Sequence, residues 1–498
     1  MKDDPVRQAP LAMDAATFRA LGHRLVDQLA ESLDAVSRGP VTRDESPSAV
    51  REALDLSAQL PEFGMDAGPL LERTAQLLFE HSLFNAHPRF FGYITAAPAP
   101  IGVLGDFLAS AVNANVGAWT LSPAATEIES QTVRWIASFI GYPADCGGLL
   151  LSGGNMANIV CFLAARAAKA GWNVREQGVT GDSGQRLRVY GSAETHTWIQ
   201  KAADIGGLGT DSIRWIQTDR NLRMDVAALR RQIEADRAAG DVPCMVVGTA
   251  GSVSTGAVDP LPDIGAVCKE YDVWFHVDGA YGGFAAAVPD APSDLRALTT
   301  ADSVAVDPHK WLYAPIEAGC ALVRDPGLLR AAFAYHPPYY HFDVEEATNY
   351  VDYGPQNSRG FRALKVWLAF RHVGASGYRT MIAGDIRLSQ AMADAVRRCD
   401  ELELVTQELS ITTFRYVPRD LRQKLGDPDV ERDLDSLNRH LLVRLQRGGE
   451  TFVSNAVVGN RYVLRACIVN FHTTLADVEA TIEIAVRMGR EVYSRRPS

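Results

Sequence analysis

The stretch Ser303-Val304-Ala305-Val306-Asp307-Pro308-His309-Lys310-Trp311 decides how the rest of this chain is interpreted. Its first four residues form a short apolar run that is typical of a buried strand, and a histidine and a lysine follow at the carboxyl end. Lys310 is the only lysine between Lys269 and Lys365. Most lysines at strand ends are surface charges, but an amine in this position can also condense with an aldehyde to form a Schiff base. The motifs upstream favour the Schiff base.

A second apolar strand ends 32 positions before Lys310, in Trp274-Phe275-His276-Val277-Asp278-Gly279-Ala280. An aspartate that leaves a core strand needs a cationic partner, because an isolated buried carboxylate is unfavourable. The protonated ring nitrogen of pyridoxal 5'-phosphate (PLP) is such a partner, and PLP chemistry combines a Schiff-base lysine with an acidic group at this nitrogen. Ala280 is small and leaves room for a flat ring. Together these motifs favour PLP as the cofactor.

Two further segments complete the predicted cofactor site. Residues 149–151 are apolar and run into the turn Ser152-Gly153-Gly154-Asn155, which precedes a helical sequence. A helix N-terminus after such a turn binds anions through free N–H groups and the helix dipole. A Gly-Gly turn alone is a weak signal, but together with the lysine and aspartate motifs it predicts the phosphate site. His196 follows another strand-like segment, where it can stack on a cofactor ring or act as an acid or base.

Composition limits the class of protein. With 498 residues and 47% hydrophobic content, the chain can bury a large core and exceeds one ordinary domain. The formal net charge of -11 and the lack of a lysine-arginine block argue against a nucleic-acid partner. We expect no membrane association, because no apolar run approaches the roughly 18 residues of a span and the N-terminus lacks a signal-peptide core. The seven scattered cysteines have no metal-site spacing and predict reduced thiols in a cytoplasmic protein.

Alternating apolar strands and helices predict an α/β fold in three parts. Residues 1–84 are expected to form an N-terminal helical dimerisation segment, although ordinary core packing also accounts for their apolar stripe. That stripe recurs at helical spacing, at Phe18, Leu21, Leu25, Leu29 and Leu33. Residues 85–375 are expected to form a large PLP-binding domain around a mostly parallel sheet. Residues 376–498 predict a small α+β domain, with strand candidates at 410–416 and 462–469 and a closing helix at 476–488.

The order of these motifs resembles that of the group II PLP-dependent amino-acid decarboxylases, which include the aromatic-L-amino-acid, histidine and glutamate decarboxylases. The similarity extends over nearly the whole chain and includes residues 87–93, 121–127 and 361–367 besides the motifs above. It implies the PLP-dependent transferase fold type I. It also implies a homodimer with the active site at the subunit interface.

The resemblance implies a role for single positions around the cofactor. Lys310 is the Schiff-base lysine, Asp278 pairs with the pyridinium nitrogen and His196 stacks over the ring. The other implied cofactor contacts are Gly154, Asn155, Thr249, Ala280 and His309.

Substrate contacts are implied in the same way. Tyr93 and Phe91 are expected to line the substrate pocket, and Trp119 lies in the segment 115–119 that would reach the neighbouring subunit's active site. The proton donor of the family's mobile loop corresponds to Tyr339, with Tyr340 as the competing candidate. Tyr339 would complete a catalytic set with Lys310, His196 and Asp278.

Two positions depart from the family pattern. Gly117 stands where the aromatic-specific members carry a bulky aromatic residue, so this wall of the substrate pocket is expected to be more open or more polar. Asp307 replaces an asparagine that is often found beside the phosphate. Because a second anion near a dianionic phosphate is unfavourable unless it points away, Asp307 is left out of the predicted phosphate site.

The predicted function is decarboxylation of an L-amino acid to the amine and carbon dioxide, with aromatic or large apolar substrates favoured. One alternative is an aldehyde synthase, which combines decarboxylation with oxidative deamination. The resemblance ties that outcome to a changed loop tyrosine or stacking histidine, so Tyr339 and His196 speak against it. A decarboxylase of a small or acidic amino acid is a further alternative. A non-catalytic PLP-binding protein on this fold should have lost Lys310, Asp278 or His196, and all three are present.

Overall fold

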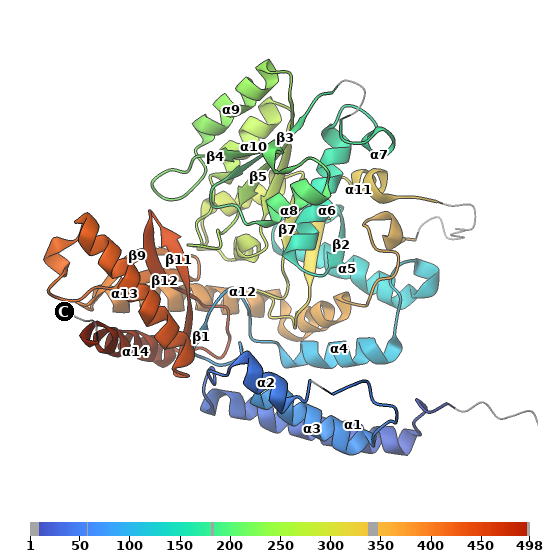
Figure 1. The fold of residues 1–498 in the computed structure, drawn as a ribbon. Helices are drawn as coiled ribbons and strands as arrows, with labels where there is room; N and C mark the ends of the chain where they lie inside the picture. The colour runs from blue at the N-terminus through green and yellow to red at the C-terminus, as the bar shows by residue number, and fades with distance from the viewer. Residues whose placement is uncertain (1–8, 57, 181–183, 337–346, 496–498) are drawn as a thin grey trace, which may run out of the picture.

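A computed structural model of the chain describes residues 9–56, 58–180, 184–336 and 347–495, and Figure 1 traces its course. The chain begins with helices α1 (Ala15–Ala35), α2 (Pro47–Ala53) and α3 (Ala67–Glu80), and the 3-10 turn η1 (Val36–Arg38) follows α1. Asp14, Ser46 and Asp66 start the three α-helices, because each side chain accepts hydrogen bonds from backbone N–H groups of the first turn.

The apolar stripe of α1 is only partly covered within the single chain. Leu21 is 9% exposed, whereas Phe18 is 56% exposed. Helices α3 and α4 (Pro100–Val112) also carry exposed apolar side chains, and these three helices lie along the same side of the molecule in Figure 1. The exposed residues of α1, α3 and α4 include Val26, Leu33, Leu70, Leu78, Leu104, Phe107 and Leu108.

The centre of the molecule is a seven-stranded sheet with the order β2-β8-β7-β6-β5-β3-β4. Its strands are β2 (Gly147–Leu151), β3 (Leu187–Ser192), β4 (Ile213–Ile216), β5 (Val242–Thr249), β6 (Trp274–Asp278), β7 (Ser303–Val306) and β8 (Gly319–Val323). Only β8 runs antiparallel to its neighbours β2 and β7, and the other pairs are parallel. The predicted mostly parallel α/β sheet is therefore confirmed.

Helices cover both faces of this sheet. This is expected because the strands carry apolar side chains on both faces, and these must be shielded from water. They are α5 (Pro123–Phe139), α6 (Gly154–Lys169), α7 (Val174–Gln177), α8 (Trp198–Ile205), α9 (Val226–Ala238), α10 (Leu261–Glu270) and α11 (Pro326–Phe333). The short 3-10 turns between them are η2 (Trp119–Leu121), η3 (Thr210–Ser212), η4 (Gly282–Ala287), η5 (Ser293–Thr300) and η6 (Tyr350–Asp352). Alternate strand residues enter different cores: Val304 and Val306 pack on one face, and Ala305 packs on the other.

The C-terminal part forms a second sheet with the order β1-β11-β12-β10-β9. Its strands are β1 (Phe90–Phe91), β9 (Leu402–Glu408), β10 (Ile411–Tyr416), β11 (Phe452–Val458) and β12 (Arg461–Cys467), packed with α13 (Pro428–Arg447) and α14 (Leu475–Ser494). The 3-10 turn η7 (Arg422–Lys424) precedes α13. The two strand candidates and the closing helix correspond to β10, β12 and α14. The sequence analysis did not anticipate β9, β11 and α13, and it assigned the residues of β1 to the large domain.

A long helix, α12 (Ala363–Arg397), connects the two sheets, and Figure 1 shows it running beneath the large domain toward the C-terminal one. Gly374 interrupts it with φ 70° and ψ 164°, a left-handed conformation that glycine adopts without strain. This kink lies beside the predicted boundary at residue 375. Among the residues that the structure describes, no helix combines the length and the apolar character of a bilayer span.

Candidate active site

The carboxyl ends of the parallel strands meet at one edge of the large sheet and enclose a cavity of about 630 Å³. The register places Thr249 of β5 opposite Asp278 of β6, and Asp278 opposite Ala305 of β7. All eight residues predicted to contact the cofactor line this cavity: Gly154, Asn155, His196, Thr249, Asp278, Ala280, His309 and Lys310. Strand direction explains this convergence, because ligand sites of α/β sheets form where the strands end.

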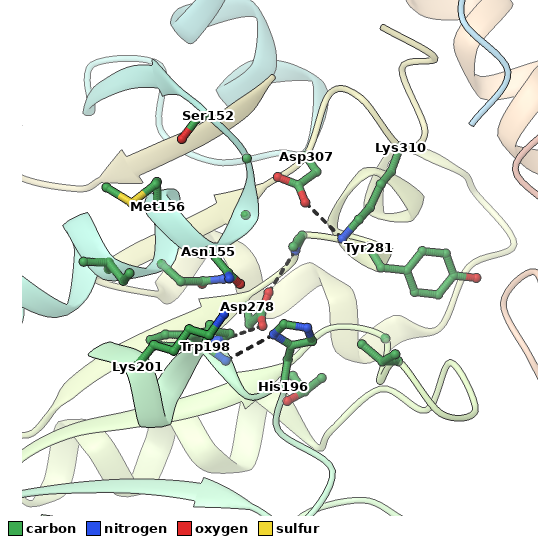
Figure 2. A pocket seen from close by; sticks show the side chains of 18 of the residues that line it. Ser152, Asn155, Met156, His196, Trp198, Lys201, Asp278, Tyr281, Asp307 and Lys310 are labelled. Carbon is green, nitrogen blue, oxygen red and sulfur yellow. Dashed lines mark hydrogen bonds and ion pairs between the residues drawn. The ribbon is translucent and has the colours of Figure 1, made fainter. Parts of the chain in front are cut away.

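Asp278 lies at the floor of the cavity and is 7% exposed. Its Oδ2 accepts a 2.7 Å hydrogen bond from Nε1 of Trp198, and its Oδ1 accepts one of 3.1 Å from the Ala280 amide (Figure 2). Both hydrogen bonds orient the carboxylate. Among the described side chains, none forms an ion pair with it. The sequence analysis did not assign Trp198 a role in the site.

His196 follows β3 and lies beside Asp278 in Figure 2. Its Nδ1 accepts a 3.2 Å hydrogen bond from the Trp198 amide, and this assignment leaves the proton on Nε2. Burial lowers the pKa of His196 below its ordinary value of 6.5, although the Asp278 carboxylate acts in the opposite direction. A neutral imidazole near neutral pH is suited to lie against an aromatic ring and to take up a proton.

The predicted phosphate site lies where β2 turns into α6. Gly153 has φ 123°, a conformation that favours glycine, and it precedes the first residue of the helix, Gly154. A Cβ on Gly154 would lie 2.6 Å from Oδ2 of Asp307 and 3.1 Å from Cβ of Ala280, so a side chain is excluded there. The first amides of a helix have no partner within the helix, and they suit an anion. His309 adds an imidazole whose Nδ1 donates to the Ala318 carbonyl at 2.7 Å.

Lys310 enters the cavity from the end of β7, as the sequence predicts. Its Nζ lies 2.9 Å from Oδ2 of Asp307, and Figure 2 shows the two side chains pointing toward each other. The Asp307 side chain is 3% exposed and lines the cavity. Asp307 was left out of the predicted phosphate site because of its charge, whereas the structure places it in the lining of the cavity.

The cavity fits PLP in its donor set and its shape. Asp278 would provide a buried carboxylate for the ring nitrogen, Gly154 would give the phosphate close access to the backbone, and Lys310 would provide the amine for the aldehyde. Oγ1 of Thr249 is buried and has no hydrogen-bond partner among the described residues, so it is available to a bound group. When bound, PLP supplies an electron sink for the bond that is cleaved.

The three residues predicted to contact substrate do not line this cavity. Phe91 is fully buried in the core of the C-terminal domain, where β1 pairs with β11, so its placement gives no support to a substrate contact. Tyr93 is 59% exposed and has φ 51°, and its carbonyl accepts from Arg465 at 3.0 Å. Trp119 donates from Nε1 to Glu127 at 2.9 Å. Tyr339 and Tyr340 lie outside the described residues.

A buried ion pair holds the segment that contains Trp119. Arg359 pairs with Glu129, and their side chains are 1% and 0% exposed. Arg359 also donates to the Val116 carbonyl at 2.8 Å, and Glu129 accepts from the Leu150 amide at 2.8 Å. The ion pair therefore fixes residues 115–119 against β2 of the central sheet.

Comparison with known proteins identifies the family of this chain. The profile of the pyridoxal-dependent decarboxylase conserved domain matches residues 47–417. The chain is 33% identical to the aromatic-L-amino-acid decarboxylase of Bacillus atrophaeus, over 94% of both chains, and 29% identical to the phenylacetaldehyde synthase of a Rosa hybrid cultivar, over 93% and 91% of the two chains. The solved structure of Oryza sativa TDC with PLP and tryptamine superposes with a TM-score of 0.89 at 29% identity, covering 97% of this chain and 99% of that one.

The fold and the cavity thus define a PLP-dependent enzyme of fold type I, as predicted. More narrowly, the chain belongs to the pyridoxal-dependent decarboxylase family. It is a PLP-dependent amino-acid decarboxylase, and the predicted cofactor and reaction class are confirmed.

Proposed function

We propose that this protein decarboxylates an aromatic L-amino acid to the corresponding amine. The observation that carries the proposal is the convergence of Lys310, Asp278 and His196 on one cavity at the strand ends. Similarity to an aromatic-L-amino-acid decarboxylase over 94% of the chain supports the aromatic substrate class. Holoenzyme incubated with each proteinogenic amino acid should release carbon dioxide and amine most rapidly with an aromatic one. Faster turnover of a small or acidic amino acid would contradict the substrate class.

In the proposed site, each residue has a physical task. Lys310 would bond to the cofactor aldehyde, and Asp278 would keep the ring nitrogen protonated by offering it a buried negative charge. His196, held by the Trp198 amide, would lie against the ring and relay protons near the reacting carbon. Gly154, Asn155 and His309 would hold the phosphate, and Thr249 and Ala280 would contact the ring.

Borohydride reduction tests the central assignment. Reduction should fix the pyridoxyl group covalently to the protein, and peptide mapping should find it on Lys310. The matched control is Lys269→Ala, which removes a surface lysine outside the cavity and should leave the labelled peptide unchanged. A pyridoxyl group on any other lysine would show that the site is assigned wrongly.

The aldehyde synthase is a second candidate, because a phenylacetaldehyde synthase is among the similar proteins. We propose that Tyr339 donates the proton that completes amine formation, so amine should exceed aldehyde in wild type. Tyr339→Phe should raise the ratio of aldehyde and hydrogen peroxide to amine when the reaction runs in air. A shift in Tyr340→Phe instead would move the proton donor by one residue. Aldehyde as the main wild-type product would favour the synthase.

We further propose that the working unit is a homodimer. Apolar side chains of α1, α3 and α4 are exposed in the single chain, and a second copy would cover them. Tyr93 and Trp119 lie outside the chain's own cavity, which agrees with a contribution to the partner's site. Light scattering should give twice the chain mass of 54.1 kDa for the active protein. An active species of a single chain mass would contradict the dimer.

A cytoplasmic location is proposed from the cysteines. All seven are free thiols, and five of them are buried. Free thiols persist in reducing compartments, whereas exported proteins form disulfides. Denatured protein from cells lysed in an alkylating reagent should carry seven alkyl groups, and fewer would argue for an oxidising compartment.

A further inference from the structure

Asp307 is a charged residue of the cavity to which the proposed roles assign no task. Its Oδ2 lies 2.9 Å from Nζ of Lys310 and 3.7 Å from Nε2 of His309. Its Oδ1 is buried and has no hydrogen-bond partner among the residues that the structure describes. A buried carboxylate with only one satisfied oxygen depends strongly on its cationic partner. The Lys310 ammonium is the closest such partner.

The same carboxylate lies against the proposed phosphate site. A Cβ built on Gly154 would be 2.6 Å from Oδ2 and 3.1 Å from Oδ1 of Asp307. Gly154 is the first residue of α6, and the free amides of this turn are the proposed phosphate ligands. A carboxylate and a phosphate at this turn would therefore be close neighbours of the same sign, which is unfavourable in a buried site.

We propose that Asp307 is a positioning residue that acts as the counter-ion of Lys310 and thereby weakens the hold of this site on PLP. The proposal rests on the proposed role of Lys310. Two effects act in the same direction. The Lys310 amine must leave the Asp307 carboxylate before it can bond to an aldehyde, and the carboxylate repels the phosphate. An asparagine at this position would remove both effects while keeping the shape.

The groups that face Asp307 come from several elements. Lys310 and His309 lie on its own loop after β7, and Asp278 and His196 lie across the cavity at the ends of β6 and β3. The turn into α6 adds backbone amides and the uncharged Asn155. Asp307→Asn changes none of these groups chemically, so a difference between wild type and Asp307→Asn reports on the carboxylate.

The experiment is equilibrium dialysis of wild type and Asp307→Asn with three probes. PLP reports both effects, pyridoxal lacks the phosphate, and 4'-deoxypyridoxine 5'-phosphate lacks the aldehyde. We expect Asp307→Asn to bind PLP about tenfold more tightly or better, and to bind each of the other two probes more tightly by a smaller factor. A merely structural lesion would weaken binding, so a gain in affinity is diagnostic.

A second pair of variants separates the two effects. In a Lys310→Ala background, Asp307→Asn should no longer change pyridoxal binding, but it should still tighten binding of 4'-deoxypyridoxine 5'-phosphate. Equal or weaker PLP binding by Asp307→Asn would overturn the role of Asp307. Borohydride mapping on the same samples tells failure of the Asp307 proposal from failure of the Lys310 assignment. A pyridoxyl group away from Lys310 would overturn both proposals. Labelling of Lys310 together with equal PLP affinities of the two proteins would overturn only the role of Asp307.

Discussion

Replacing Asp278 with asparagine tests the electrostatic centre of the proposed site. Asp278 is 7% exposed, and its carboxylate accepts hydrogen bonds from Trp198 and from the Ala280 amide. An asparagine oxygen can still accept a hydrogen bond, but the side chain offers no charge to the ring nitrogen. Losing one partner of a buried ion pair costs about 3–5 kcal/mol. This corresponds to a loss of PLP affinity of about two to three and a half orders of magnitude.

Equilibrium dialysis of PLP against wild type and Asp278→Asn measures this loss. Trp198→Phe is the matched control, because it removes the 2.7 Å hydrogen bond and keeps the charge. A hydrogen bond to a charged group contributes about 1.5–3 kcal/mol, so the control should lose less affinity than Asp278→Asn. An Asp278→Asn protein that melts like wild type and binds PLP within about twofold of it, a difference of less than 0.5 kcal/mol, would refute the pairing.

Two further predictions concern stability. Glu129→Gln leaves Arg359 buried without its counter-ion, so the free energy of unfolding should fall by about 3–5 kcal/mol in denaturant titrations. Arg490→Gln, at an ion pair whose arginine is 60% exposed, should lower the free energy of unfolding far less, and equal losses would contradict the reasoning. Burial raises the pKa of Asp385 from 3.8 to about 7, so the folded protein keeps a proton that the unfolded chain releases near pH 4. This stabilisation is complete below that pH and is lost as pH rises toward about 7. Asp385→Asn should therefore flatten the decline of the thermal midpoint over this range, and identical pH profiles would argue against a protonated carboxyl.

The strand ends could be predicted from the sequence because their signal is local. Apolar runs that end in Asp278 or in His309 and Lys310 indicate both the strand and its functional end. Trp198 could not be assigned, because its indole reaches a carboxylate 80 positions away, and only the fold brings the two together. Asp307 was expected to point away from the site because its charge would repel a phosphate. The structure instead shows its carboxylate directed at the amine of Lys310.

The C-terminal sheet was harder to predict for a different reason. Strand β1 has two residues, too few for a periodic pattern, and its partner β11 lies more than 360 positions later in the chain. The family resemblance predicted a substrate contact for Phe91, and the structure places its side chain in the core of the C-terminal domain. In contrast, β10 and β12 are long and fully or nearly fully buried, and their apolar character made them recognisable.

The same pairing has a consequence for how the protein is made. Phe90 and Phe91 are synthesised more than 360 residues before Phe452 and Val453, beside which they lie in the sheet. Gly92 sits so close to the Phe452 ring that a Cβ would approach it to 2.4 Å. Because synthesis proceeds from the N-terminus, β1 has no strand to pair with until β11 has been made. A ribosome that stalls before Phe452 would release a chain whose Phe91 has no β11 strand to pair with.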